Sequence, residues 1–259
     1  MYWGSIKWYS GVALVVFACA LGAGCASTAE EDATGGSVTV KMPTSPTASD
    51  CAIPILQSQR AAADLDPPAG TYRFAVRGKR KLSGSQGYSR KLPKEMRLIV
   101  LPAESFGQVK CFVAQRRYSD SLADTSTFAI RGDDVYLTRL LVQSGGQIAD
   151  VLPRPPVQSI AGSGSVWSGQ FRGPTSGSYR MELLGRKSMT LRGERVTAAG
   201  IQSEFVFNGD FTGRESSERW IATETNEIIS ERVHQERNFG VDVISLDYTA
   251  RLAEGPGER

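Results

Sequence analysis

Alternation of hydrophobic and polar residues is the strongest pattern in the chain from Thr71 onward. Tyr72, Phe74 and Val76 occupy every second position there. A period of two places the apolar side chains of a strand on one face of a sheet. Further segments show such alternation or a short apolar run, namely Arg97–Leu101, Val109–Val113, Asp134–Val142, Tyr179–Leu184, Arg195–Phe207 and Ile244–Leu252. The pattern predicts a mainly β fold, in which an antiparallel multi-stranded sheet forms a half-open or closed barrel.

One helix is predicted, near the start of this region. The segment Ile55–Leu65 (ILQSQRAAADL) has helical spacing, and Pro67 and Pro68 stop it. The fold class is therefore α+β at most, with one short N-terminal helix.

Two segments resemble each other. Gly70–Arg80 and Gly177–Lys187 both read G-[TS]-Y-R-x4-G, followed by basic residues. One interpretation is a duplicated β-meander, with halves at 70–152 and 165–253. The other is that Gly, Tyr and Arg recur at strand starts by chance.

The N-terminus has the pattern of a secretory signal peptide over residues 1–24. Lys7 precedes an apolar run, Gly11–Ala23, that ends in small residues. The alternative is an uncleaved membrane helix, but such a helix needs about 20 apolar residues. We therefore expect an exported protein.

Cys25 completes a sequence, Leu21–Cys25 (LGAGC), that resembles a bacterial lipobox. The resemblance implies cleavage before Cys25, acylation of its thiol and attachment to the outer face of the cell membrane, with membrane lipid as the partner. Cys19 is a second candidate, but the large Phe17 precedes it. Residues 25–50 are rich in small and polar residues, which predicts a lipidated flexible tether.

The tether leads into a predicted single β-rich domain at 51–253, followed by a disordered tail at 254–259. Cys51 and Cys111 are the two remaining cysteines. In an exported protein such a pair favours a disulfide, here closing a loop of about 60 residues and worth ~4 kcal/mol. The alternative is two reduced, buried thiols.

Charge and motifs point to no reaction. The net charge of +3 comes from 30 basic and 27 acidic residues, which gives no reason to expect nucleic acid. His234 is the one histidine, and on a strand it would share a solvated face with Arg232 and Glu236. The carboxylate pairs Asp133-Asp134 and Glu215 with Glu218 could in principle serve glycoside hydrolysis, but a polar turn between two strands explains Asp133-Asp134 better. We predict no catalytic residues, no metal site, no cofactor and no enzyme activity.

The C-terminal half, about Val196–Leu252, resembles uncharacterised actinobacterial envelope lipoproteins. The resemblance lies in a long strand ending at Asn208-Gly209, a strand containing Trp220, and two closing strands. The same order is similar to the half-barrel lipid-carrier lipoproteins, which implies a cup for an acyl chain. Those carriers place helices across the open face, whereas this sequence offers none between its strands.

These features lead to two hypotheses of function. The first is an envelope lipoprotein that binds or carries a hydrophobic or lipid ligand. The candidate lining residues are aromatic, namely Trp167, Phe205, Phe207 and Trp220. The second is a structural or protein-interaction lipoprotein with a filled core and no small-molecule ligand. Basic clusters at Arg77–Lys81, Arg90–Lys94 and Arg116-Arg117, expected at strand ends and turns, would meet anionic headgroups or simply aid solubility.

Overall fold

The computed structural model describes residues 45–51, 64–83, 87–119, 122–144, 147–160, 165–240 and 242–257. These residues form strands and connecting turns, and no helix occurs among them. The strands are β1 (Gly70–Ser83), β2 (Tyr88–Lys91), β3 (Glu95–Val100), β4 (Glu104–Phe106), β5 (Val109–Ser119), β6 (Leu122–Arg131), β7 (Asp134–Ser144), β8 (Gln147–Val151), β9 (Val157–Ile160), β10 (Val166–Phe171), β11 (Ser176–Leu191), β12 (Glu194–Asn208), β13 (Thr212–Ala222), β14 (Ile228–Phe239) and β15 (Asp242–Glu254).

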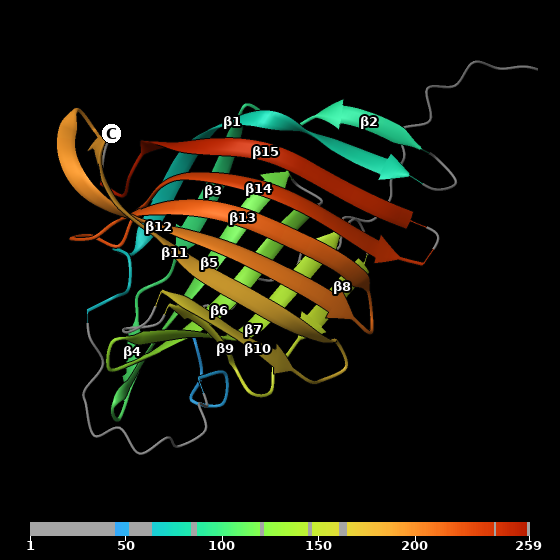
Figure 1. The fold of residues 1–259 in the computed structure, drawn as a ribbon, viewed down its shortest axis with the longest axis horizontal. Coiled ribbons are helices and arrows are strands. Elements are labelled where there is room, and N and C mark those ends of the chain that lie inside the picture. The colour runs from blue at the N-terminus through green and yellow to red at the C-terminus, as the bar shows by residue number, and fades with distance from the viewer. Residues whose placement is uncertain are drawn as a thin grey trace, which may run out of the picture. The chain divides into compact units, whose positions relative to one another are not determined.

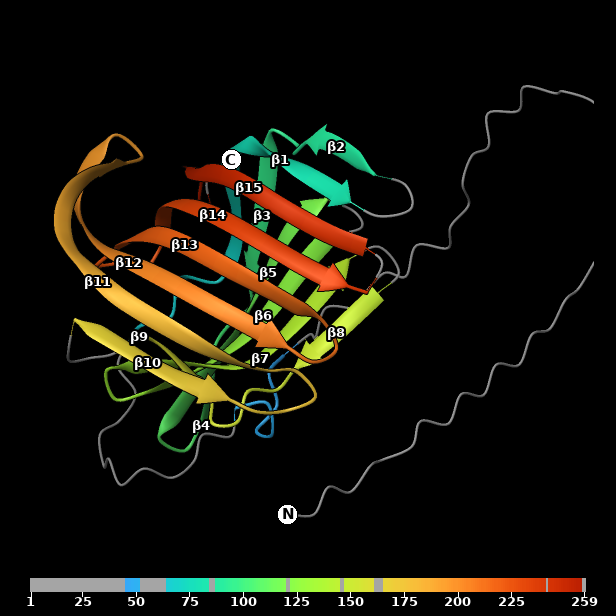
Figure 2. The ribbon, with the colours of Figure 1, turned by 45° about the vertical axis from the view of Figure 1, so that its right-hand side comes forward.

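All fifteen strands belong to one antiparallel sheet. Its order is β10-β11-β12-β13-β14-β15-β1-β3-β5-β6-β7-β8, so two sequential meanders join where β15 pairs with β1. Figures 1 and 2 show β11–β15 crossing in front of β5–β8, because the sheet curves around on itself as a half-barrel. The predicted fold class is confirmed.

The two ends of the sheet approach each other through β9 and β10. Arg154 and Arg172 form an isolated antiparallel bridge, and the Trp167 indole N–H donates to the Gln158 carbonyl at 2.7 Å. These contacts hold the ends together, although β9 and β10 do not form a ladder with each other.

The side chains between the layers follow the predicted alternation. Tyr72, Phe74 and Val76 on β1 are buried, and they pack with Leu246 and Tyr248 on β15 in one hydrophobic cluster. A second cluster joins β7, β8 and β10–β12, and includes the stacked rings of Phe205 and Phe207. Both predicted Tyr-Arg starts, Tyr72 and Tyr179, lie early in a strand. The duplication itself stays a prediction.

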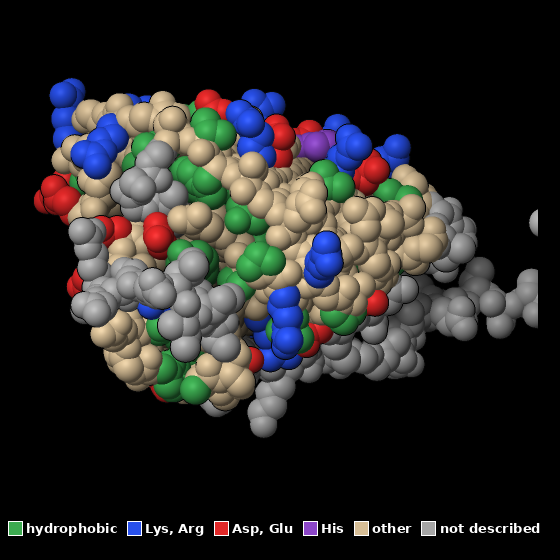
Figure 3. Space-filling view, turned by 60° about the horizontal axis from the view of Figure 1, so that its bottom comes forward, with side chains coloured by type: hydrophobic (Ala, Val, Ile, Leu, Met, Phe, Trp, Pro, Cys, Tyr) green, Lys and Arg blue, Asp and Glu red, His purple; other side chains and the backbone are tan. Residues whose placement is uncertain are grey.

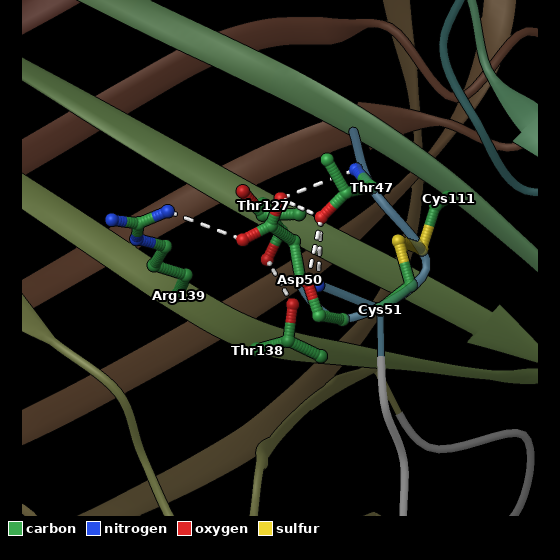
Figure 4. The surroundings of a disulfide bond; sticks show 8 residues. Thr47, Asp50, Cys51, Cys111, Thr127, Thr138 and Arg139 are labelled. Carbon is green, nitrogen blue, oxygen red and sulfur yellow. Dashed lines mark hydrogen bonds and ion pairs between the residues drawn. A yellow bond between two sulfur atoms is a disulfide. The ribbon is translucent and has the colours of Figure 1, made fainter. Parts of the chain in front are cut away.

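A disulfide joins Cys51 to Cys111 on β5, as predicted (Figure 4). It fixes a short segment against the sheet, since Asp50 also accepts a bond from Arg139 of β7 at 3.1 Å. The Thr47 hydroxyl donates to the same Asp50 carboxylate at 2.6 Å. The bridge and the ion pair together attach this segment to two neighbouring regions of the sheet.

Four predictions concern residues that the structure does not describe, wholly or in large part. The signal peptide, Cys25 and nearly all of the tether lie outside the described residues, as does the helix Ile55–Leu65 except for its last two residues. Among the described residues, no helix has the length and apolar character needed to cross a membrane.

Candidate functional site

A cavity of about 210 Å³ lies between the two layers of the sheet. Its walls come from β1, β3 and β5–β7 on one side and from β11–β14 on the other. The volume exceeds the roughly 150 Å³ that holds a benzene molecule in an engineered cavity. It is smaller than the range of about 300–1,000 Å³ typical of drug-sized ligands. The space therefore suits a small molecule or one segment of a longer one.

Most of the cavity wall is apolar. On one side, the rings of Phe112 of β5 and Phe128 of β6 stack with their centroids 5.0 Å apart. On the other side, the rings of Phe205 and Phe207 of β12 stack with their centroids 5.7 Å apart. Aliphatic side chains complete this part, namely Leu98, Val100, Val135, Leu137, Leu140, Ile201, Ile221 and Ile228. Protein interiors normally pack to the density of organic crystals. An apolar cavity of this size therefore stays open only where further contacts hold its walls apart.

Polar and charged residues form the rest of the wall, and several of the charged ones belong to an ion-pair network that includes the buried Glu231 behind them. Arg116 of β5 bonds Glu231 of β14 at 2.9 Å, and Arg219 of β13 reaches the same carboxylate at 3.3 Å. Because strands β5 and β14 belong to opposite layers, the first of these pairs spans the half-barrel. The Tyr248 hydroxyl donates to the other Glu231 oxygen at 3.0 Å. Glu231 is thus held from three strands.

A second set of charges extends this network. Arg237 donates two parallel bonds of 2.9 Å to Asp124 of β6, again across the layers. Its side chain is only 3% exposed. Glu215 accepts a bond of 2.5 Å from Gln235 and lies 3.5 Å from Arg219, which links the two sets. Planar guanidinium groups are well suited to such bidentate, buried pairing.

The network is electrically balanced among the described residues. Three arginines, Arg116, Arg219 and Arg237, face three carboxylates, Asp124, Glu215 and Glu231. Each carboxylate therefore has cationic partners, which is the condition for keeping buried charges ionised.

The pKa values follow from this pairing. Burial alone would raise the pKa of Glu231, but Arg116 and Arg219 outweigh it and hold that pKa below its usual value. Burial would lower the pKa of Arg237, yet Asp124 and Glu215 raise it. Burial raises the pKa of the Tyr118 and Tyr248 hydroxyls, so both stay protonated. Glu231 and Arg237 therefore stay charged over the ordinary pH range, and the two tyrosine hydroxyls stay neutral.

Two donors of the network lack a partner. The Nε–H groups of Arg116 and Arg237 are buried and make no hydrogen bond within the described part of the chain. Both residues line the cavity. An unsatisfied buried donor costs about 1–3 kcal/mol, so these two groups lower the stability that the network contributes.

The predicted site residues lie in different places. Phe205 and Phe207 line the cavity. Trp167 and Trp220 do not: Trp167 packs beside β9 near the meeting ends of the sheet, and Trp220 lies on the outer face of β13. Hydrophobic side chains also gather in a hollow on one face of the domain (Figure 3).

The charged residues correct three expectations. Arg116 and Arg117 lie inside β5 rather than at a strand end, and Arg116 belongs to the cavity wall. Glu215 and Glu218 do not form a pair, because Glu215 turns into the half-barrel and Glu218 is exposed outside it. Arg77–Lys81 likewise runs along β1 rather than ending it.

The remaining candidate residues lie on an exposed strand face and around a turn. His234 is exposed on β14, opposite Asp247 of β15. Asp133 lies in the turn before β7, and Asp134 accepts a bond from Gln158 at 3.1 Å. In the described ranges, no group of His, Cys, Asp and Glu side chains has the arrangement of a metal site.

The comparisons with known proteins place the chain in no family. No protein-family model and no curated protein matches the sequence. Two solved structures are similar in part. One is an exported protein from Bacteroides fragilis described as having a YmcC-like fold, with 9% identity over 74% of this chain and 98% of that chain, and a TM-score of 0.29. The other is described as a lipoprotein from Parabacteroides distasonis, with 11% identity over 75% of this chain and 100% of that chain, and a TM-score of 0.30. Scores this low carry no inference about this chain.

Proposed function

We propose that the protein is an exported lipoprotein, attached to the membrane through acylated Cys25, whose half-barrel binds a small hydrophobic or lipid-like molecule without transforming it. The observation that carries the binding function is the apolar cavity of about 210 Å³ between the layers. The N-terminal pattern of Lys7, an apolar run and a lipobox-like sequence supports the export and the anchor.

The wall chemistry narrows the class of ligand. Apolar surface favours a hydrocarbon or ring, worth about 0.8 kcal/mol for each buried CH₂ group. The charges of the network already balance, so a ligand with a net charge would leave one charge without compensation inside the domain. A neutral ligand, including one that carries an ester or alcohol oxygen, would leave that balance of charge unchanged. The favoured ligand is therefore an uncharged amphiphile whose apolar part is short or enters only in part.

Native mass spectrometry of the protein extracted from membranes in mild detergent tests both parts of the proposal. We expect an adduct of lipid mass that is lost on denaturation, which marks a bound ligand. We also expect covalent acyl mass on the N-terminal peptide that remains after denaturation. A bare polypeptide that stays bare after incubation with envelope lipids would contradict the binding function, and an unmodified Cys25 would contradict the anchor.

A matched pair of substitutions places the ligand. Ile201 of β12 lines the cavity, and its neighbour Gln202 is exposed on the other face of the same strand. Ile201→Trp should fill the cavity and abolish the adduct, whereas Gln202→Trp should leave it. Equal adducts in both variants would place the ligand elsewhere.

The second candidate, a protein-interaction lipoprotein, has one observation in its favour. Val166, Leu183 and Leu184 are the large hydrophobic residues that stand exposed in the described part, at 45%, 40% and 38%. They are close together, because β10 pairs with β11 and the Leu183 N–H donates to the carbonyl of Ser165, the residue before Val166. If the protein carries no ligand, this end of β10 and β11 is the surface to test with partner proteins.

A further inference from the structure

The outer face of the same sheet carries a second concave site, which the proposed function does not use. A groove of about 850 Å³ lies over β1 and β13–β15. The strand register builds its floor from two neighbouring rows of outward residues. One row runs Trp220, Ser230, Arg251 and the next runs Glu218, Arg232, Thr249, Arg77. Neighbouring strands thus place these side chains side by side.

Cationic side chains dominate the groove. Five of them line it, namely Arg77, Lys94, Lys187, Arg232 and Arg251, and they come from five different parts of the chain. Only two carboxylates accompany them, those of Glu218 and Glu231. Glu231 is buried and directs its carboxylate to Arg116 and Arg219 inside the half-barrel. Glu218 accepts a bond of 2.6 Å from the Trp220 indole. The groove therefore has a clear excess of positive charge.

Trp220 shapes the floor of the groove. Its ring lies against Gly200 of β12, where an added Cβ would come within 2.7 Å of the ring. The Lys187 ammonium sits 3.3 Å from the ring centroid, a cation–π contact. The ring is thus held between the sheet and a lysine, and it reports on whatever approaches that lysine.

We propose that this groove binds a phosphate-bearing anion. Arginine forks match phosphate oxygens and lysine adds a point charge, so five converging cations with little opposing charge favour a group with several oxyanion atoms. A concave basic surface also concentrates anions from solution. The same chemistry is offered by the headgroup of an anionic phospholipid and by a soluble phosphate ester.

The test uses Trp220 as its reporter. The sequence has four tryptophans, and cleavage before Cys25 removes Trp3 and Trp8, so replacing Trp167 by Phe leaves Trp220 alone in the mature protein. The mature protein in uncharged detergent is titrated with dihexanoyl phosphatidylglycerol, with glycerol 1-phosphate and with dihexanoyl phosphatidylcholine as the headgroup without net charge. Fluorescence and titration calorimetry are measured together.

We expect saturable binding of at least one anionic probe, weakened by added salt. Binding of phosphatidylglycerol alone identifies a lipid headgroup, and binding of glycerol 1-phosphate alone identifies a soluble ligand. Binding of both shows that phosphate recognition suffices. Absence of binding by both methods, or equal binding of phosphatidylcholine, would overturn the proposal.

Matched charge substitutions separate the groove from general attraction. Lys187→Gln with Arg232→Gln removes two charges from the groove, and we expect affinity to fall about tenfold or more. Lys79→Gln with Lys91→Gln removes the same charge from an exposed cross-strand pair on β1 and β2 outside the groove. These two substitutions should leave the affinity for the anionic probes nearly unchanged. Equal losses in the two pairs would show that net charge alone acts. Since none of these side chains lines the cavity, loss here leaves the adduct of the proposed ligand intact.

Discussion

The inner wall of the half-barrel and its outer groove are built on the same strands, yet they treat charge in opposite ways. On β14, Glu231 and Arg237 point inward and are buried, whereas Arg232 between them points outward and is exposed. Inside, three arginines meet three carboxylates, and every charge is paired. Outside, five cations share the groove with two carboxylates.

This difference indicates separate roles for the inner ion-pair network and for the cations of the outer groove. Paired charges in a buried interior attract one another strongly, so they hold the two layers at a fixed separation and leave the cavity open. Exposed charges of one sign are hydrated and contribute little to stability. They remain free to meet a partner instead. The inner set is therefore structural for the cavity, and the outer set is a surface for ligands.

The largest expected effect comes from breaking an inner pair. Arg237→Leu would leave the Asp124 carboxylate buried without its partner, and we expect the free energy of unfolding to fall by about 3–5 kcal/mol. Arg232→Leu, five residues earlier on the same strand, should change it by no more than about 0.5 kcal/mol. Urea unfolding of both variants measures the contrast. Similar losses in the two variants would show that the faces of β14 do not differ as described.

An intermediate effect is expected on acidification. Arg116 and Arg219 hold the pKa of Glu231 below its usual value of 4.5, so the folded state binds that proton less readily than the unfolded chain does. This contribution to stability is present above about pH 4.5 and is lost as the pH falls through the folded-state pKa. Unfolding midpoints should therefore decline below that pH. In Glu231→Gln the decline should be shallower, and an unchanged slope would exclude Glu231 as its source.

The smallest effect is expected on the outer face. Gly200→Ala would place a methyl group 2.7 Å from the Trp220 ring, but the ring is only half-buried and has room to lift. We expect a loss of about 1 kcal/mol in the free energy of unfolding. The Trp220 fluorescence should change as well, because the ring is pushed toward Lys187 and their contact must rearrange. Unchanged fluorescence would mean that the ring does not lie on Gly200.

Much of the fold could be predicted from sequence because one face of most strands is apolar. On β1 and β15, alternation of Tyr72, Phe74 and Val76, and of Leu246 and Tyr248, identified both the strands and their buried face. Pairing of Cys51 with Cys111 was also predictable, since the domain offers only these two cysteines. Strand alternation is visible in a short stretch of sequence, and the cysteine pairing can be inferred without knowing how the two layers of the sheet face each other.

The charged wall could not be predicted in the same way. β14 carries polar residues on both faces, so its pattern does not show that Glu231 is inside and Arg232 outside. Arg116 resembled part of a surface cluster because its partner Glu231 lies 115 residues away. Only the folding of the sheet onto itself brings the two together. The same reason left Trp220 as a candidate for the cavity, although it faces outward.

If the domain is tethered as proposed, the disulfide determines where a pull on the N-terminal segment enters the sheet. A pull on the chain before Cys51 passes through the bridge to Cys111, and so enters the sheet at β5. Strands β1, β2, β3 and β4 all lie between the two cysteines in sequence and are bypassed by that load. Under the proposed anchor through Cys25, traction on the N-terminal segment would thus be applied first to β5, in the interior of the sheet, and not to the start of β1.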